Sequence, residues 1–200
     1  MSNAANPADP TACPVCGPPL LDWLAQSPPL MQRWNALPRL ALRRGDTLLR
    51  AGACADAVWF VEQGLLRSFF LDAHGRERNH GFYAEAQWLG LPPPAKPSRH
   101  GLQALLPSRL RVLSHAELGR WRADEPALAG LLTQALTLDI QRLAERCEQL
   151  LMLDAPARYR LFLDQQPDLA ARLAQRQIAS YLGITEVALS RIRRRTGIRP

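Results

Sequence analysis

The stretch RQIASYLGITEVALSRIRRRTGIRP, residues 176–200, is the most informative part of this 200-residue chain. Two short apolar segments flank Gly183, a residue type that commonly ends one helix before the chain turns into the next. The second segment runs directly into Arg191 and then into the three consecutive arginines 193–195. This layout predicts a helix-turn-helix, a motif whose second helix is shaped to enter the major groove of DNA.

The positive charge of the chain is concentrated on the same stretch. The whole chain carries a net charge of +7, and residues 171–200 hold seven arginines against the single acidic residue Glu186, a net +6. Charge gathered on one small region is typical of a domain that binds a polyanion. Lys96 is the only lysine among the 25 basic residues. This arginine bias fits bidentate contacts to guanine and phosphate, and it equally fits a GC-rich genome.

The composition indicates a folded cytosolic protein. Hydrophobic residues make up 47% of the chain, which is enough to bury a core. The longest apolar runs are far too short to span a membrane, and the N-terminus lacks the basic and apolar regions of a secretory signal. We therefore expect a cytoplasmic protein with no membrane partner, whose cysteines do not form a disulfide framework.

The order of patterns along the chain predicts an α+β protein in four parts. Residues 1–19 are expected to be a flexible tail, and 20–115 a β-roll sensor domain with a leading helix over Leu20–Leu37. Residues 116–153 are expected to form a long helix used for dimerisation, and 154–200 the helix-turn-helix domain. The segment LPPPAKPS, residues 91–98, must be a loop because it is rich in proline. The predicted strands are Arg39–Leu42, Thr47–Arg50, Val58–Glu62, Leu65–Leu71, Asn79–Tyr83 and Arg109–Leu113.

The long helix carries an apolar stripe at three- and four-residue steps. It begins near Pro126, which suits a first helical turn, and continues for about 26 residues. A helix of this length usually packs against a partner that covers its apolar stripe. The partner is either a second copy of the chain, which would give a homodimer, or the β-roll of the same chain. The stripe consists of Leu128, Leu131, Leu132, Ala135, Leu138, Leu143, Cys147, Leu150 and Leu151.

Two strings in this order resemble the Crp/Fnr family of bacterial transcription regulators. They are RRGDTLLRAGACADAVWFVEQGLLRSFFLDAHGRERNHGFYAEAQWLG (43–90) and RQIASYLGITEVALSRIRRRTG (176–197), and the resemblance extends over roughly 37–197. It implies a cyclic-nucleotide-binding-like jelly roll with tight turns at Gly45, Gly52 and Gly64. It further implies a homodimer that reads a palindromic site on double-stranded DNA and works with RNA polymerase.

The resemblance also assigns roles within the reader motif. Residues 177–182 would be the supporting helix and 185–194 the recognition helix, with Thr185 as its N-cap. Arg191 is the expected guanine contact. Leu189 and Ile192 are expected to be core residues of the helix. The four side chains expected to face the base pairs are Glu186, Val187, Ser190 and Arg191, and those expected to contact phosphate are Thr185, Gln175, Arg176, Arg193, Arg194 and Arg195.

Two departures from the family pattern concern DNA binding. The family often has an acidic residue where this chain has Val187, and a valine can only touch a thymine methyl group. The operator sequence therefore cannot be taken over from well-known members. Family members also commonly continue into a β-hairpin wing, and only TGIRP follows the arginine cluster. We expect the wing to be reduced or absent and the arginines 193–195 to offset it.

Further departures concern the effector. Nucleotide-responsive members hold the ribose and cyclic phosphate with a Gly-Glu pair and an Arg-Ser/Thr pair. In this chain Leu91 follows Gly90, and His100 follows Arg99. A buried phosphate needs a cation and further donors, so we do not expect a response to cyclic AMP. The candidate effector pocket is Gly90, Arg99 and His100.

The alternative function is a sensor module with weakened DNA contact that either binds a small ligand or, through its cysteines, responds to redox state or metal. Cys13 and Cys16 form a C-x-x-C pair, and Cys54 and Cys147 bring the number of sulfur ligands to the four that an iron–sulfur cluster needs. The ordinary interpretation is that the pair lies in a tail and that Cys147 is a small buried thiol. We expect no cofactor, with the cluster as the alternative.

Neither the histidines nor the acidic residues indicate catalysis. His74, His80, His100 and His115 lack ligand spacing and are expected at surface or loop positions. No nucleophile elbow, phosphate-binding loop or zinc motif is present. We expect that the chain is not an enzyme.

Overall fold

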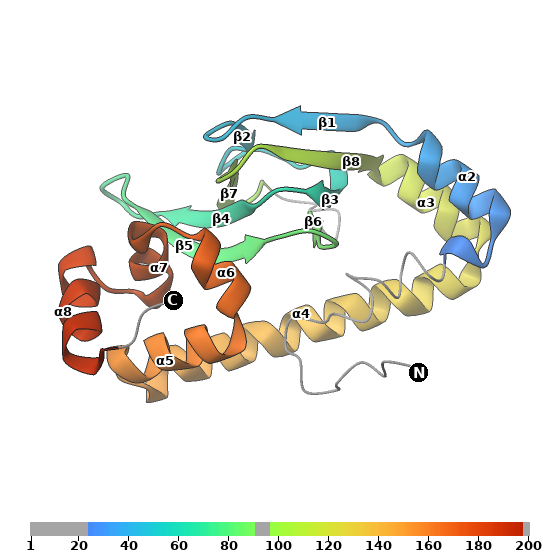
Figure 1. The fold of residues 1–200 in the computed structure, drawn as a ribbon. Coiled ribbons are helices and arrows are strands. Elements are labelled where there is room, and N and C mark those ends of the chain that lie inside the picture. The colour runs from blue at the N-terminus through green and yellow to red at the C-terminus, as the bar shows by residue number, and fades with distance from the viewer. Residues whose placement is uncertain (1–23, 91–96, 198–200) are drawn as a thin grey trace. The chain divides into compact units, whose positions relative to one another are not determined.

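The structure is a computed structural model that describes residues 24–90 and 97–197. The chain divides into two compact units, one within Pro14–Asp139 and the other containing Ile140–Pro200. The first unit holds the strands and the second holds the C-terminal helices (Figure 1).

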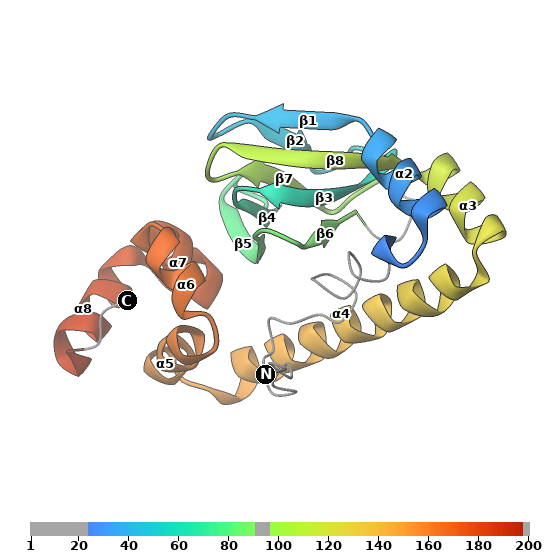
Figure 2. The same cartoon turned by 45° about the vertical axis from the view of Figure 1, so that its right-hand side comes forward.

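The first unit is a roll of two four-stranded antiparallel sheets, which lie over one another in Figure 2. The first sheet has the strand order β1-β8-β3-β6 and the second β2-β7-β4-β5. Consecutive strands therefore often lie in different sheets, as in a jelly roll. The strands are β1 (Arg39–Leu42), β2 (Thr47–Leu49), β3 (Ala57–Gln63), β4 (Leu66–Leu71), β5 (Glu77–Tyr83), β6 (Trp88–Leu89), β7 (His100–Ala104) and β8 (Ser108–Ser114).

The interior of the roll is formed by alternate residues of both sheets. Trp59 and Leu110 of the first sheet pack with Leu66 and Leu102 of the second. Each of these side chains is at most 5% exposed, as expected for the inward positions of a two-residue period. The turn between β3 and β4 needs glycine, since Gly64 has φ +112° and an added Cβ would come within 2.6 Å of the Ser108 backbone.

A second core lies at one end of the first sheet, under two helices. Trp34 of α2 (Pro28–Ala36) packs its ring edge on Phe60 of β3, with centroids 5.0 Å apart. Trp121 of α3 (His115–Asp124) joins the same cluster. Arg111 of β8 fixes the end of α2, because its guanidinium donates to the Trp34 carbonyl oxygen at 2.5 Å and lies over the Trp34 ring.

The second unit contains the end of α4 (Pro126–Met152) and four shorter helices. These are α5 (Ala155–Gln165), α6 (Pro167–Arg172), α7 (Gln175–Leu182) and α8 (Glu186–Thr196). Asp154 caps α5 by accepting from the backbone amide of Ala157 at 2.8 Å. Gly183 ends α7 in the left-handed conformation with φ +73°, as its place in the sequence predicts.

The predicted fold class is confirmed: a jelly roll, a long helix and a helix-turn-helix occur in the expected order. Positive φ values at Gly45, Gly52 and Gly64 confirm the predicted tight turns. The expectation of a reduced or absent wing concerns the residues after α8, of which 198–200 lie outside the described residues, as do residues 91–96 of the proline loop.

Three expectations about the elements need correction. Two strands were missed, β6 and β7, and the second begins at His100, a residue of the candidate effector pocket. The leading helix does not run unbroken to Leu37, because Ser27 separates α2 from the residues before it. The segment after Ala116 is not one helix, since Glu125 ends α3 before Pro126 begins α4.

Candidate nucleic-acid interface and ligand-binding roll

The reader motif consists of α7, a short turn and α8. Thr185 caps α8 as predicted, since its hydroxyl accepts from the backbone amide of Ala188 at 3.1 Å. Leu189 and Ile192, which are 0% and 9% exposed, form the buried side of α8, as expected. One side of α8 is thus buried, and its opposite side is available for contacts with another molecule.

The opposite side of α8 is an exposed face of mixed chemistry. Val187 is 61% exposed, an unusual position for a valine in an isolated domain. Glu186, Ser190 and Arg191 are also exposed, and they lie within about 100° of Val187 around the helix. The structure therefore brings together the four side chains expected to face the base pairs.

The three consecutive arginines do not form one patch. Neighbouring residues of a helix point about 100° apart, so the three side chains fan out around α8. Arg194 is exposed on the same face as Val187, which lies two turns earlier. Arg193 is half-buried on one side of this face, and Arg195 is exposed on the other. Helical geometry alone could have shown this from the sequence.

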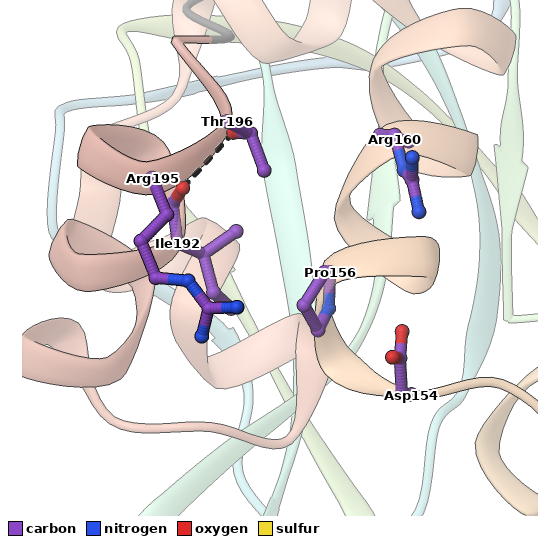
Figure 3. Close-up of a pocket in the computed structure, with 6 residues that line it drawn as sticks. All are labelled: Asp154, Pro156, Arg160, Ile192, Arg195 and Thr196. Carbon is purple, nitrogen blue, oxygen red and sulfur yellow. Dashed lines mark hydrogen bonds between the residues drawn. The ribbon is translucent and has the colours of Figure 1, made fainter.

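A hollow of about 290 Å³ lies between the start of α5 and the end of α8, on the side of α8 that carries Arg195 (Figure 3). Arg195 and Ile192 line it from α8, and Pro156 and Arg160 line it from α5. The Thr196 hydroxyl at its edge donates to the Ile192 carbonyl oxygen at 2.9 Å. Arg195 therefore borders the surface of α5 as well as the exposed face of α8.

Two arginines from outside the motif hold the C-terminal end of α7. The Arg146 guanidinium donates to the Tyr181 carbonyl oxygen and lies 4.0 Å above the Tyr181 ring. Burial lowers the pKa of Arg146 and raises that of the Tyr181 hydroxyl. Arg158 donates to the carbonyl oxygens of Leu182, at 3.2 Å, and Leu153, at 2.6 Å. Both cations satisfy carbonyl groups at helix ends, where positive charge is favoured.

The N-terminus of α7 is open. Its N-cap residue, Ala174, makes no side-chain hydrogen bond to the first turn. Gln175 and Arg176 are exposed there. Free backbone amides at a helix start bind anions such as phosphate, so this end of α7 is a second candidate contact with DNA.

The candidate effector residues have different surroundings. Gly90 has φ +86°, and an added Cβ would lie 2.8 Å from the Ala57 carbonyl oxygen, so glycine is needed here for packing. Arg99 is exposed. The Ser98 hydroxyl donates to the His100 carbonyl oxygen at 2.8 Å and accepts from the His100 amide. The serine beside Arg99 is therefore already engaged within its own loop.

The predicted surface or loop positions of the histidines are correct for His74 and wrong for the others. His80 and His100 are half-buried on β5 and β7 and lie in ring contact with Phe70. His115 begins α3, and both its ring nitrogens are buried. Contacts made across strands join residues 70, 80 and 100, so no local spacing in the sequence reveals them.

The cysteines also differ from the ordinary interpretation. Cys147 is exposed, so the expectation of a buried thiol is wrong. The reason is that its helical stripe is uncovered, since Ile140 and Leu143 nearby are 66% and 47% exposed. Cys54 is exposed as well, and the described residues contain no group of three or more metal-binding side chains. Cys13 and Cys16 lie outside the described residues.

The two halves of α4 differ in burial. The first half contributes Leu128 and Ala135, which are 5% and 0% exposed. The second half leaves Leu150 and Leu151 45% and 82% exposed, together with the residues around Cys147. None of the described helices is long and apolar enough to cross a membrane.

Comparison with known proteins agrees with this architecture. Residues 39–124 match the family described as the cyclic nucleotide-binding domain. The transcriptional regulatory protein btr of Bordetella pertussis is 28% identical over 172 residues, which cover 80% of this chain and 71% of that protein. The structure of FixK2 from Bradyrhizobium japonicum has a TM-score of 0.73 at 21% identity, covering 82% of this chain and 87% of FixK2.

A CooA mutant from Carboxydothermus hydrogenoformans also has a TM-score of 0.73, at 18% identity, covering 90% of this chain and 85% of CooA. The chain thus combines a cyclic nucleotide-binding domain with a C-terminal helix-turn-helix. Its fold is similar to those of solved transcription regulators described as members of the Crp/Fnr family, at 15–17% identity. The relative btr is named as a transcriptional regulatory protein, in agreement with the expectation that the chain is not an enzyme.

Proposed function

We propose that this protein is a sequence-specific DNA-binding regulator that acts as a homodimer on a palindromic site. The observation that carries this proposal is the exposed face of α8. It presents apolar, acidic and basic side chains on the side of the helix opposite the buried Leu189 and Ile192. A recognition helix enters the major groove, and a twofold dimer places its half-sites about 34 Å apart.

Each side chain on this face suits one kind of base contact. Arg191 donates in bidentate fashion to the N7 and O6 atoms of guanine. Val187 touches a thymine methyl group, and Glu186 accepts from a cytosine amino group. Ser190 bonds with either donors or acceptors. The preferred half-site therefore contains a guanine and a thymine at neighbouring positions along the groove.

The phosphate contacts come from both helices of the motif. Arg193, Arg194 and Arg195 diverge around α8, so they reach the backbones on the two sides of the groove. Gln175 and Arg176 add contacts at the open start of α7. The Thr185 hydroxyl accepts a hydrogen bond from one backbone amide, and its own hydrogen remains available to donate to phosphate.

The second half of α4 supplies the dimer contact. Ile140, Leu143, Cys147 and Leu150 follow one another at steps of three and four residues and are all exposed. Two such helices pair by burying these side chains against each other. A parallel arrangement around a twofold axis places both recognition helices on one side of the dimer.

Cyclic AMP is not the effector in this proposal. The exposed Arg99 and the internally bonded Ser98 offer no paired cation and hydroxyl for a buried phosphate. We place the action of the protein in the cytoplasm, with RNA polymerase as its functional partner.

Selection of genomic fragments by the purified protein at moderate salt tests the proposal. We expect an enriched palindromic site, and an R191A variant that binds it about 5- to 100-fold more weakly, because one bidentate base contact is lost. R122A, which changes an exposed arginine of α3, is the matched control and should bind normally. A folded dimer that selects no sequence, or an R191A variant that binds like the control, would refute DNA readout by α8.

A further inference from the structure

The hollow between α5 and α8 is bounded by one side of each helix, and both helices belong to the same compact unit. Pro156 and Arg160 are four residues apart on α5, so they share a face of that helix. Ile192 and Arg195, three residues apart, likewise share a face of α8. The hollow measures about 290 Å³, just below the range of about 300–1,000 Å³ that sites for drug-sized molecules span. It therefore has room for one small ligand.

Two arginine side chains line the hollow, one from each helix (Figure 3). Arg160 and Arg195 are both exposed, and neither side chain forms an ion pair or a hydrogen bond with another described residue. Arg146 and Arg158 of the same unit differ, since both donate to carbonyl oxygens at helix ends. Two unpaired guanidinium groups around one small hollow repel each other, and an anion bound between them offsets this repulsion. The hollow therefore favours a negatively charged ligand.

A phosphate monoester matches this pair of cations in charge and in hydrogen bonding. It carries a charge of about −1.5 to −2 at pH 7 and three strong acceptor oxygens. Arginine presents a planar fork of donors that binds phosphate oxygens in bidentate fashion. Because Arg160 extends from α5 and Arg195 from α8, the two guanidinium groups approach one phosphate from different sides.

The rest of the lining suits a carbon skeleton that carries hydroxyl groups. Ile192, which is 9% exposed, and the half-buried Pro156 supply apolar surface. Asp154 lines the hollow from the residue before α5. Its Oδ1 atom accepts from the Ala157 amide, whereas its Oδ2 atom has no hydrogen-bond partner among the described residues. An ionised carboxylate only accepts hydrogen bonds, so Oδ2 favours a ligand with a hydroxyl donor over a bare anion.

We propose that Asp154, Arg160, Ile192 and Arg195 form a binding site for a small sugar phosphate. The phosphate binds between the two guanidinium groups, the carbon skeleton lies against Ile192, and a hydroxyl group donates to Asp154 Oδ2. The site lies entirely in the helical unit. Arg195 is also a proposed phosphate contact on DNA, but the binding of the sugar phosphate does not depend on DNA recognition.

Titration calorimetry of the full chain with glucose 6-phosphate tests this site, alongside three probes that lack one or more features. We expect a Kd below about 1 mM for glucose 6-phosphate, and no binding of glucose, which lacks the phosphate, at about 10 mM. Methyl phosphate, which lacks the hydroxyl groups, should bind about threefold more weakly, and inorganic sulfate more weakly still. The side-chain Nε–H NMR signals of Arg160 and Arg195 should shift with glucose 6-phosphate and not with glucose.

Variants assign the contacts. R160Q and R195Q should each weaken glucose 6-phosphate about fivefold, because each removes one charge-assisted pair. D154N keeps the cap of α5, since asparagine is an equally good N-cap, and should reduce the preference for glucose 6-phosphate over methyl phosphate. R122Q, which changes an exposed arginine of α3 in the other unit, is the matched control and should bind like the unchanged protein.

No binding of glucose 6-phosphate at about 10 mM, binding of sulfate as tight as that of the sugar phosphate, or an R160Q variant that behaves like R122Q would overturn the proposal. R160Q also distinguishes a free phosphate ester from the DNA backbone. It should leave the slope of log DNA affinity against log salt unchanged, and a decrease of about one unit would show that the hollow binds a DNA phosphate instead. The titrations contain no DNA, so their failure leaves the proposed function of α8 untouched.

Discussion

Arginine plays opposite parts in the roll and in the reader. In the roll, Arg67 and Arg111 are 7% and 6% exposed and pair with Glu77 and Glu62. On α8, Arg191 is exposed and forms no ion pair with the described residues. A buried arginine that lost its partners would cost several kcal/mol, whereas an exposed one adds little to stability and is available to a ligand. The surroundings of an arginine, more than the abundance of arginine, therefore indicate which arginines are available to a ligand.

The largest expected effect comes from R111A in the roll. The substitution removes the buried one of the two arginines that pair with Glu62, leaving only the exposed Arg39 at 3.2 Å, and frees the Trp34 carbonyl oxygen. We expect the free energy of unfolding to fall by about 3 kcal/mol, measured by urea denaturation. R109A, two residues earlier on β8 and exposed, should change it by less than about 0.5 kcal/mol. Equal effects of the two variants would remove the contrast between buried and exposed arginines.

An intermediate effect is expected at Arg146, a half-buried arginine of the reader unit. Here the partners are a carbonyl oxygen and an aromatic ring instead of a carboxylate. R146M keeps much of the packing and loses the hydrogen bond and the cation–π contact with Tyr181, so we expect a loss of about 1.5 kcal/mol. Hydrogen exchange of the α7 amides should rise in R146M and stay normal in R142M, which lies four residues earlier on α4. Unchanged exchange in both variants would show that Arg146 does not hold α7.

Exposed arginines of α8 should affect DNA binding and leave stability unchanged. Arg194 shares the outer face with Val187, and R194Q tests the phosphate contact that we propose for it. We expect the slope of log affinity against log salt to decrease by about one unit, with affinity lowered for all sequences alike. Urea denaturation should be unaffected. A variant that changes sequence preference without changing the salt slope would place Arg194 against a base.

The reader and the roll also differ in how far the sequence predicts them. Thr185 caps the start of α8 and Gly183 ends α7, both as expected, because capping is a local interaction within a few residues. Strands β6 and β7 were missed, since they are two and five residues long and their pairing partners lie far away in the chain. The sequence of β7, HGLQA, has none of the β-branched residues that mark a strand.

The candidate sites also could be predicted only where they depend on contacts between residues close together in the sequence. The outer face of α8 could be predicted because helical spacing brings nearby residues together. The ring cluster of Phe70, His80 and His100 could not, because it depends on the register of three strands and on a bulge in the pairing of β4 with β5. The exposure of Cys147 was also unpredictable, since an apolar stripe in a sequence does not say which molecule covers it.

The smallest expected effect distinguishes His100 from the arginines by its response to pH. Burial lowers the pKa of His100 below the value of about 6.5 that the imidazole has in the unfolded chain. Between these two pKa values the unfolded state binds more protons, so the stability of the roll falls as pH drops below about 6.5 and levels off below the folded-state pKa. H100L cannot titrate, and the difference in urea midpoint between pH 7.5 and 5.5 should shrink. H74L, in an exposed turn, should keep the difference of the unchanged protein. If H100L keeps it as well, burial in the roll does not disfavour the charged form of the imidazole.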